Sequence, residues 1–411
     1  MENGQKVTNN IIMLYIMNIV QLILPLIILP YLTRVLSVDN YGVVAYVKSI
    51  IIYSTLVIEF GFMLSATHDV VKNSNNKEKI SRIIGRTTQA KLFLSIIAFV
   101  ILLFMIAFIP ILQRHALFVI MSFGSPFLSI FLYDYFFRGI EQMQIITFRY
   151  LIMRGISTIL TFMFVKGDPN LLLIPLFDII GSLAAVIWIH HYFVKMDIHI
   201  KFDKIRNVIF SLKESFTYFV SDMSATVFGA FNTLLVGIFL STTDVAYWGI
   251  LSTLIAAVQT MYSPICDGIY PHMIKTRSFK LLLRIILFFS PLLIIGGCIT
   301  FFGAKYIMLI IGGAKYAPAT GYLRLCTPVL VITFFSSLLG WPTLGAIDKV
   351  SETTLTTIFA AIVQVVGLAL LITTHHFSLT SVILMRTLSE LMMLLGRFGF
   401  TVKFRHLFNF D

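Results

Sequence analysis

The sequence has 411 residues, of which 58% are hydrophobic and only 12% are charged. Soluble domains contain about 25% charged residues, so this composition indicates an integral membrane protein. No polar stretch is long enough for a soluble domain of about 100 residues, which argues against a membrane-tethered catalytic domain. The net charge of +12 would suggest a nucleic-acid partner in a soluble protein. In a membrane protein the positions of the basic residues are more informative than their sum, and no nucleic-acid partner is expected.

Hydropathy predicts twelve membrane-spanning helices, because a span needs about 20 consecutive apolar residues. Short turns such as "SVDN" and "KGDPN" separate the helices on one side, and longer basic segments separate them on the other. In chain order, the predicted helices cover residues 11–33, 41–65, 87–110, 116–137, 146–166, 171–194, 216–240, 246–270, 281–303, 318–342, 354–374 and 379–402.

The distribution of Lys and Arg supports this layout. If the N-terminus is cytoplasmic, 23 of the 31 basic residues fall on the cytoplasmic side, five on the other side and three inside helices. A bias near five to one is a strong positive-inside signal. It predicts that both termini are cytoplasmic.

The first hairpin turn, "YLTRVLSVDNYG" at residues 31–42, has a counterpart later in the chain. Ser37 and Asp39 are expected to cap the second helix. The segment "FLSTTDVAYWG" near residues 239–249 repeats the pattern, and Leu36-Ser37 aligns with Leu240-Ser241. Tyr15 and Asn18 align with Tyr218 and Ser221 in the same way, although chance similarity between apolar sequences is an alternative.

The repeat predicts two six-helix lobes of parallel topology, related by a pseudo-twofold axis along the membrane normal. The N-terminal lobe would cover residues 1–194, a basic cytoplasmic linker residues 195–215, and the C-terminal lobe residues 216–411. The fold class is therefore an all-α integral membrane protein with two lobes.

Three segments carry a resemblance to a known family. "PLIILPYLTRVLSVDNYG" resembles the first-hairpin signature of Wzx-type flippases of bacterial polysaccharide synthesis. "EFGFMLSATHDV" resembles that family's segment at the end of the second helix, except that His68 stands where arginine is common. "SPICDGIYPHM" resembles its Tyr-Pro at the end of the eighth helix. The family belongs to the multidrug/oligosaccharidyl-lipid/polysaccharide exporter superfamily.

The resemblance implies a V-shaped twelve-helix exporter that is not an enzyme and has no cofactor. Its cargo would be an undecaprenyl-diphosphate-linked oligosaccharide, moved from the cytoplasmic to the outer leaflet by alternating access. Partners would be this lipid-linked oligosaccharide and membrane lipids, with a polysaccharide polymerase and a chain-length regulator as further candidates.

Charged residues inside the predicted helices are candidate contacts for an anionic headgroup, because a charge at a helix centre costs about 2.5–3.5 kcal/mol on insertion scales. Arg and Lys form charge-assisted hydrogen bonds with phosphate. Structural pairing or snorkelling to the interface is the alternative for each of them. Arg386, for example, has Glu390 four residues later. The candidate substrate contacts are Lys48, Arg324, Arg386 and, at the outer mouth, Arg34.

Acidic and polar residues in the first, second and seventh helices are candidates for a wet cavity or for a coupling proton or sodium ion. Lys48 and Glu59 are 11 residues apart and share one helical face, with Thr55 on the same side. Polar contacts that hold helices together are the alternative. The candidates for ion coupling or cavity lining are Glu59, Asp222, Asn18, Gln21, Ser221 and Ser224.

The remaining charged residues favour structural roles. Asp134 is expected to pair with Arg138 four residues later, and Asp178 lies toward its helix end in the region of His190 and His191. No metal site is expected, because the His pairs lack HExxH spacing or Cys partners. A cation-coupled drug exporter of the same superfamily is the main alternative function, and a membrane-embedded polysaccharide polymerase or glycosyltransferase is a weaker one.

Overall fold

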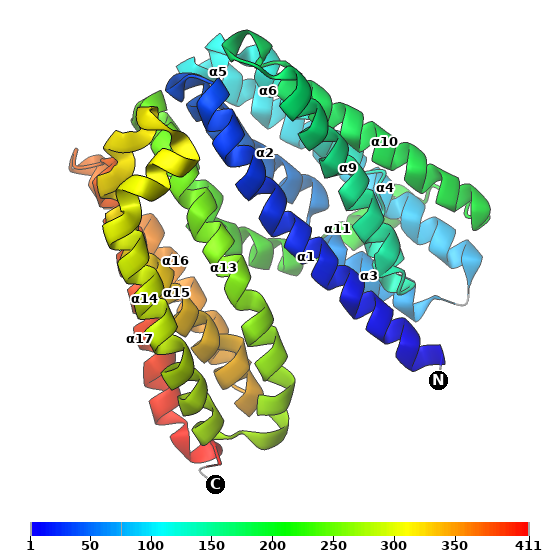
Figure 1. Cartoon of the computed structure of the whole chain (residues 1–411). Coiled ribbons are helices and arrows are strands. Elements are labelled where there is room, and N and C mark those ends of the chain that lie inside the picture. Colours follow the sequence, from blue (N-terminus) through cyan, green and yellow to red (C-terminus); the bar gives the residue numbers. More distant parts are fainter. Residues whose placement is uncertain (1, 75, 410–411) are drawn as a thin grey trace. The chain divides into compact units, whose positions relative to one another are not determined.

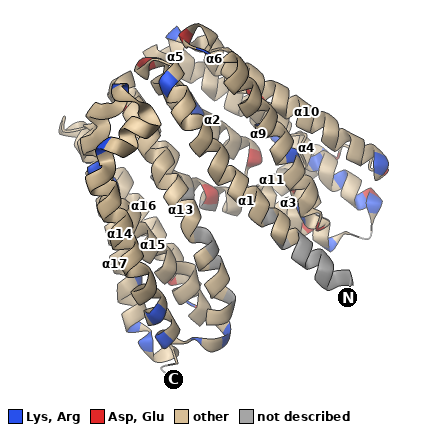
Figure 2. Ribbon diagram, in the orientation of Figure 1, with Lys and Arg blue, Asp and Glu red and all other residues tan. Residues whose placement is uncertain are grey.

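The computed structural model describes residues 2–74 and 76–409. In this part of the chain, eleven helices are long and apolar enough to cross a membrane, and no strand is formed beyond an isolated bridge between Ser278 and Asn409 (Figure 1). Charged residues are sparse along the helices and gather toward their ends (Figure 2). The prediction of an all-helical, multi-pass membrane protein is confirmed.

The predicted helix at residues 216–240 is not among these eleven spans. Its residues are divided among α11 (Ile205–Thr226), the π-helical segment η2 (Val227–Phe231) and α12 (Asn232–Phe239). Among the residues whose side chains the structure describes, Gly229–Phe239 forms a shorter apolar helix there. Helical structure runs without a gap from Ile205 to Phe239, so the predicted helix over residues 216–240 is confirmed, with a π-helical segment inside it. That this helix crosses the membrane stays a prediction.

Contacts divide the chain into two compact units, Met1–Thr226 (unit 1) and Val227–Asp411 (unit 2). The predicted lobe and linker boundaries stay a prediction. The other elements of unit 1 are α1 (Glu2–Val35), α2 (Val38–Glu59), α3 (Phe62–Lys72), α4 (Lys77–Phe108), α5 (Pro110–Arg114), α6 (Ala116–Ser122), α7 (Gly124–Ser129), α8 (Asp134–Gly139), α9 (Met143–Phe164), η1 (Asp168–Asn170) and α10 (Leu173–Lys195). Those of unit 2 are α13 (Thr242–Thr276), α14 (Phe279–Gly312), η3 (Ala314–Ala319), α15 (Thr320–Leu338), η4 (Leu339–Leu344), η5 (Gly345–Ile347), α16 (Val350–Thr373), α17 (Leu379–Lys403) and η6 (Arg405–Leu407).

The first hairpin turn of each unit is capped by the aligned serine. Ser37 precedes α2, and its hydroxyl accepts a hydrogen bond from Asn40 N at 3.2 Å. Ser241 precedes α13 and forms a reciprocal capping box with Asp244. The predicted serine cap of the second helix is confirmed, and the same device recurs at the aligned position of unit 2.

The second predicted helix, residues 41–65, is interrupted near its C-terminal end. Phe60 and Gly61 adopt left-handed conformations, with φ of 43° and 76°, and separate α2 from α3. Helix α11 packs onto this break, since a Cβ atom on Gly61 would lie 2.6 Å from Tyr218 Cβ. The Phe60 ring stacks on Phe219 with centroids 4.5 Å apart. Glycine is required at position 61 for both its backbone conformation and this close approach.

The basic segment between α10 and α11 is bonded to α4. Lys201 N donates to Ser81 O at 3.2 Å, and Asp203 N donates to Gln89 Oε1 at 2.9 Å. Gln89 Nε2 donates back to Asp203 O at 3.2 Å. Gly85 lies between these contacts, where a Cβ atom would be 1.9 Å from Lys201 O. The segment is therefore held along α4 by one backbone hydrogen bond and by the side chain of Gln89, at a position that requires glycine.

Replacing Gly85 by alanine is expected to destabilise unit 1 by about 1–3 kcal/mol, because the added methyl group overlaps a backbone carbonyl that hydrogen bonds hold in place. The matched control is Gly155→Ala in α9, where a Cβ atom would meet nothing within 4 Å. Thermal unfolding of the purified full chain in detergent should show a lower midpoint for Gly85→Ala and an unchanged or higher one for Gly155→Ala. Equal midpoints for the two variants would contradict the close contact.

Candidate functional site

One face of α2 lines two adjoining cavities inside unit 1. The larger has a volume of about 370 Å³ and is lined by Lys48 of this helix. The smaller has a volume of about 270 Å³ and is lined by Thr55 and Glu59. Ile51, Ser125 and Arg154 line both. Helical periodicity explains the arrangement, because residues three to four positions apart project from one side of a helix.

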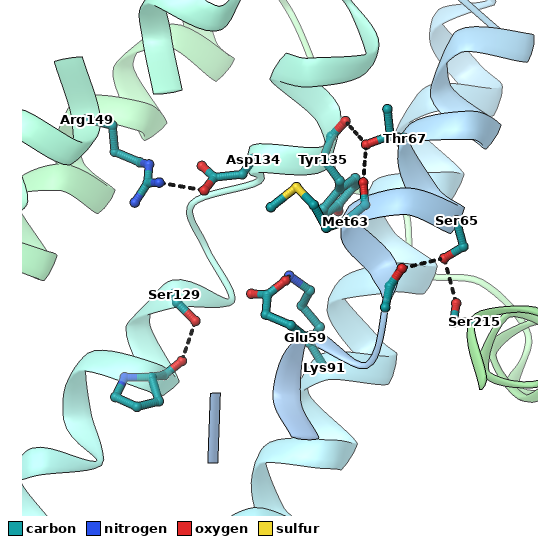
Figure 3. A network of polar contacts seen from close by, with 12 residues as sticks. Glu59, Met63, Ser65, Thr67, Lys91, Ser129, Asp134, Tyr135, Arg149 and Ser215 are labelled. Carbon is teal, nitrogen blue, oxygen red and sulfur yellow. Dashed lines mark hydrogen bonds and ion pairs between the residues drawn. The ribbon is translucent and has the colours of Figure 1, made fainter. Parts of the chain in front are cut away.

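Two ion pairs line the smaller cavity (Figure 3). Lys91 Nζ of α4 lies 2.7 Å from Glu59 Oε2, at the last residue of α2. Arg149 of α9 lies 2.5 Å from Asp134 Oδ2, at the first residue of α8. The two cationic side chains are only 3% and 7% exposed. Each therefore depends on its carboxylate, because a buried charge without a partner is strongly unfavourable.

The Arg149–Asp134 pair retains hydrogen-bonding capacity. Asp134 Oδ1 and Arg149 Nε are buried and have no hydrogen-bond partner among the described residues. Lys91 Nζ also lies 5.3 Å from the centre of the Tyr135 ring, in reach of a cation–π contact. The ammonium group of Lys91 is thus stabilised by a carboxylate and by an aromatic ring.

The larger cavity contains a cation that its acidic residue does not fully neutralise. Asp178 of α10 accepts a hydrogen bond from Ser157 Oγ at 2.6 Å and lies 3.5 Å from Arg154 Nη1. Within residues 2–74 and 76–409, Lys48 makes no ion pair, and its side chain is exposed to the cavity.

Basic residues outnumber acidic ones in the lining of the two cavities together. The basic residues are Lys48, Lys91, Arg149 and Arg154, and the acidic ones are Glu59, Asp134 and Asp178. The three acidic residues pair with Lys91, Arg149 and Arg154, so the excess positive charge lies at Lys48, beside the half-exposed Arg154. This arrangement suits an anionic guest.

The other predicted cationic contacts lie outside the two cavities. Arg386 of α17 is buried, and its guanidinium lies 3.7 Å from the carboxylate of Glu390. This is the intrahelical ion pair that the sequence offered as the alternative to a substrate contact. Arg324 of α15 is exposed, and its Nε donates to Phe301 O at 3.2 Å. Arg34 is exposed in the last turn of α1.

The predicted polar candidates are exposed where the structure describes their side chains. Asn18 and Gln21 are exposed on α1, and Asp222 is exposed on α11. The side chains of Ser221 and Ser224 lie outside the described part of the chain. Glu59 is therefore the ion-coupling candidate that the structure places in a charged cavity.

Three cations of the site, Lys91, Arg149 and Arg154, were missed as site residues by the sequence-based reasoning. Lys91 and Arg149 lie within four residues of a predicted cytoplasmic helix end, and Arg154 lies eight residues from it. All three were counted with the positive-inside charges. The pairing expected for Asp134 was also wrong, because its partner is Arg149 on the next helix instead of Arg138. A signal was present in the sequence, since all three cations stand next to apolar runs.

Solved structures show the class of the fold. The chain superimposes on the lipid II flippase MurJ in an inward closed conformation with a TM-score of 0.72 and 15% identity, covering 96% of this chain and 87% of that one. An inward-facing multidrug resistance MATE family transporter of the MOP superfamily gives a TM-score of 0.68 and 13% identity, covering 95% and 98%. The chain thus has the fold of a helical membrane transporter.

Sequence comparison gives the family. Residues 7–277 match the family described as "Polysaccharide biosynthesis protein", and the chain belongs to that family. A protein named "Putative O-antigen transporter" from Escherichia coli (strain K12) is 26% identical over 353 residues, or 82% of this chain and 83% of that protein. One of the same name from Shigella dysenteriae is 26% identical over 324 residues, or 77% and 80%. These relatives are named as transporters, which confirms the prediction of a transporter and not an enzyme.

The Lys91–Glu59 pair is expected to show strong energetic coupling. Glu59→Gln leaves Lys91 buried without its counter-charge and should cost about 3–5 kcal/mol, whereas Glu59→Gln combined with Lys91→Met should cost less than the sum of the single changes. Unfolding in mixed detergent micelles measures this double-mutant cycle. The control is the same cycle on Arg82 and Glu78, an exposed pair at 3.1 Å, for which little coupling is expected. Additive changes at Lys91 and Glu59 would contradict the assigned pair.

Proposed function

We propose that this protein flips an undecaprenyl-diphosphate-linked oligosaccharide repeat unit from the cytoplasmic to the outer leaflet of the bacterial inner membrane, by alternating access through a central cationic cleft. The family, the relatives named as O-antigen transporters and the fold shared with a lipid II flippase support this proposal. Both termini are then cytoplasmic, as the distribution of Lys and Arg predicts.

The observation that carries the proposal is the uncompensated charge of Lys48 beside Arg154 in the larger cavity of unit 1. A diphosphate carries about two negative charges, and Lys and Arg bind phosphate through charge-assisted hydrogen bonds. A volume of about 370 Å³ suits a compact charged group better than a whole oligosaccharide. We therefore assign the diphosphate to this cavity, with the sugars and the polyprenyl chain outside it.

The remaining cations have secondary places in the proposal. Arg324 and Arg34 are exposed and are proposed as further contacts along the path of the headgroup. Arg386 would contact substrate only after its pair with Glu390 opened. A polysaccharide polymerase and a chain-length regulator are the proposed partners that take up the flipped product.

The energy for transport is proposed to come from gradients, since the sequence contains no P-loop. Outward movement of an anion from a negative interior is favoured by about 2.3 kcal/mol per charge per 100 mV. Glu59 and Asp222 are the proposed carriers of a coupling proton or sodium ion. A cation-coupled drug exporter is the second candidate, and it is disfavoured because the excess charge in the cavities of unit 1 is positive.

Lys48→Ala, Arg154→Ala and Arg324→Ala are expected to abolish or strongly reduce polysaccharide export, because each removes a proposed phosphate contact. The measurement is surface polysaccharide in a flippase-null strain that carries each variant, with the membrane level of the protein checked by immunoblot. Lys305→Ala, at an exposed residue of α14, is the matched loss of a positive charge and should export normally. Normal export by both Lys48→Ala and Arg154→Ala would overturn the diphosphate assignment.

Ion coupling can be tested separately. Proteoliposomes that contain the purified protein and a lipid-linked oligosaccharide should flip faster when an inward proton or sodium gradient is imposed. Glu59→Gln should lose this acceleration, because the amide cannot exchange a proton or balance a sodium ion. Transport that ignores both gradients would remove the coupling role of Glu59 and Asp222, and would leave the flippase proposal standing.

A further inference from the structure

A third charged cavity lies in unit 2, at the turn between α13 and α14. Its volume is about 670 Å³, and four of its lining residues, His272, Lys275, Lys280 and Arg284, have basic side chains. No Asp or Glu lines it among the described residues. Basic residues gather at this end of unit 2, where the C-terminus lies (Figure 2).

The positive charge of this cavity is not neutralised within the described chain. The side chains of Lys275, Lys280 and Arg284 are exposed and form no ion pair with residues 2–74 or 76–409. The neighbouring Arg277 differs, because its Nη2 lies 2.7 Å from Asp348 Oδ2. The cavity also lies at the N-terminal end of α14, where the helix dipole adds positive potential.

The cavity is built on a fixed turn. Arg277 takes a left-handed conformation with φ of 47° and ends α13, and Ser278 caps α14 by accepting from Leu281 N at 3.2 Å. Asn409 closes the turn from the other side. Its N donates to Arg277 O at 2.8 Å, its O accepts from Phe279 N at 2.8 Å, and its Nδ2 donates to Thr276 O at 2.7 Å. Asn409, the last described residue, thus joins the C-terminal end of α13 to the N-terminal end of α14.

The helical face that carries the two basic residues of α14 continues as an exposed apolar surface. Arg284 follows Lys280 by one turn, and Leu287 and Phe288 follow by the next, so all four lie on one side of the helix. Leu287 and Phe288 are 71% and 73% exposed. Only 6% of the most apolar window of α14 is buried, the lowest share among the eleven spans. Basic residues at a helix end followed by an open apolar face suit a phospholipid, with headgroup and acyl chain in that order.

We propose that the turn between α13 and α14 binds the phosphate of an anionic phospholipid, whose acyl chains lie along the exposed face of α14. The positive-inside layout places this site in the cytoplasmic leaflet. Lys280 and Arg284 contact the phosphate from α14, and Lys275 and His272 complete the cavity from α13. The site is separate from the cavities of unit 1 and does not depend on the identity of the cargo.

Native mass spectrometry of the full chain in mild detergent tests this proposal. Added phosphatidylglycerol should bind with higher occupancy than added phosphatidylcholine. The double variant Lys280→Gln and Arg284→Gln should bind phosphatidylglycerol at least tenfold more weakly than the unchanged protein. Both residues are exposed, so the variant is expected to fold, and its thermal midpoint checks this. The matched control is Lys72→Gln with Lys79→Gln, which removes the same charge from exposed positions of unit 1.

Three outcomes would overturn the proposal. The first is unchanged phosphatidylglycerol binding in the Lys280/Arg284 variant. The second is an equal loss in the Lys72/Lys79 control, which would indicate a general effect of surface charge. The third is full displacement of the lipid by millimolar inorganic phosphate, which would indicate a site for small anions only. Export in the flippase-null strain is measured in parallel, so that a failure of this site and a failure of the flippase proposal remain distinguishable.

Discussion

The cost of placing charge inside a hydrocarbon layer determines how unit 1 is built. An unpartnered ionised side chain at mid-membrane costs about 2.5–3.5 kcal/mol on insertion scales, yet four cations and three carboxylates line its two cavities. The structure meets this cost by pairing Lys91 with Glu59 and Arg149 with Asp134 across different helices. These pairs join α4 to α2 and α9 to α8, so the same interactions that make the cavities charged also fix the helices around them.

The paired carboxylates lie where helices stop. Glu59 is the last residue of α2, directly before the left-handed Phe60 and Gly61, and Asp134 is the first residue of α8, directly after the left-handed Tyr133. Irregular backbone at membrane depth is tolerated where it is buried in protein or lines a cavity. Asp134 gains from the positive end of its helix, whereas Glu59 faces the negative end of α2 and depends on Lys91 for compensation. The helix breaks therefore place the carboxylates that pair with the buried cations of the cavities.

The sequence was sufficient for the features that depend on local periodicity and composition. Apolar length predicted the spans, the serine cap before α2 followed from its side chain, and the 11-residue spacing placed Lys48 and Glu59 on one face of α2. The partners of these residues could not be predicted in the same way. Lys91 is 32 residues from Glu59, and nothing in the local pattern specifies which helices pack together. The break at Phe60 was missed because hydropathy does not register a change in backbone handedness at two residues.

Unit 2 shows that a cation in this chain need not serve a ligand. Arg397 is 8% exposed, and its Nη1 donates to Ser336 O at 2.6 Å, close to Gly340, whose ψ of −115° departs from helical geometry at the end of α15. Its Nη2 and Nε reach Thr357 and Thr356 of α16 at 2.9 Å and 3.3 Å. A guanidinium provides five donors, which lets one side chain satisfy backbone and hydroxyl acceptors on two neighbouring helices. Lys48, in contrast, has charge and no ion pair within the described chain. The difference between a cation that holds helices together and one that is free to bind an anion therefore lies in the acceptors around it, and these are set by tertiary packing.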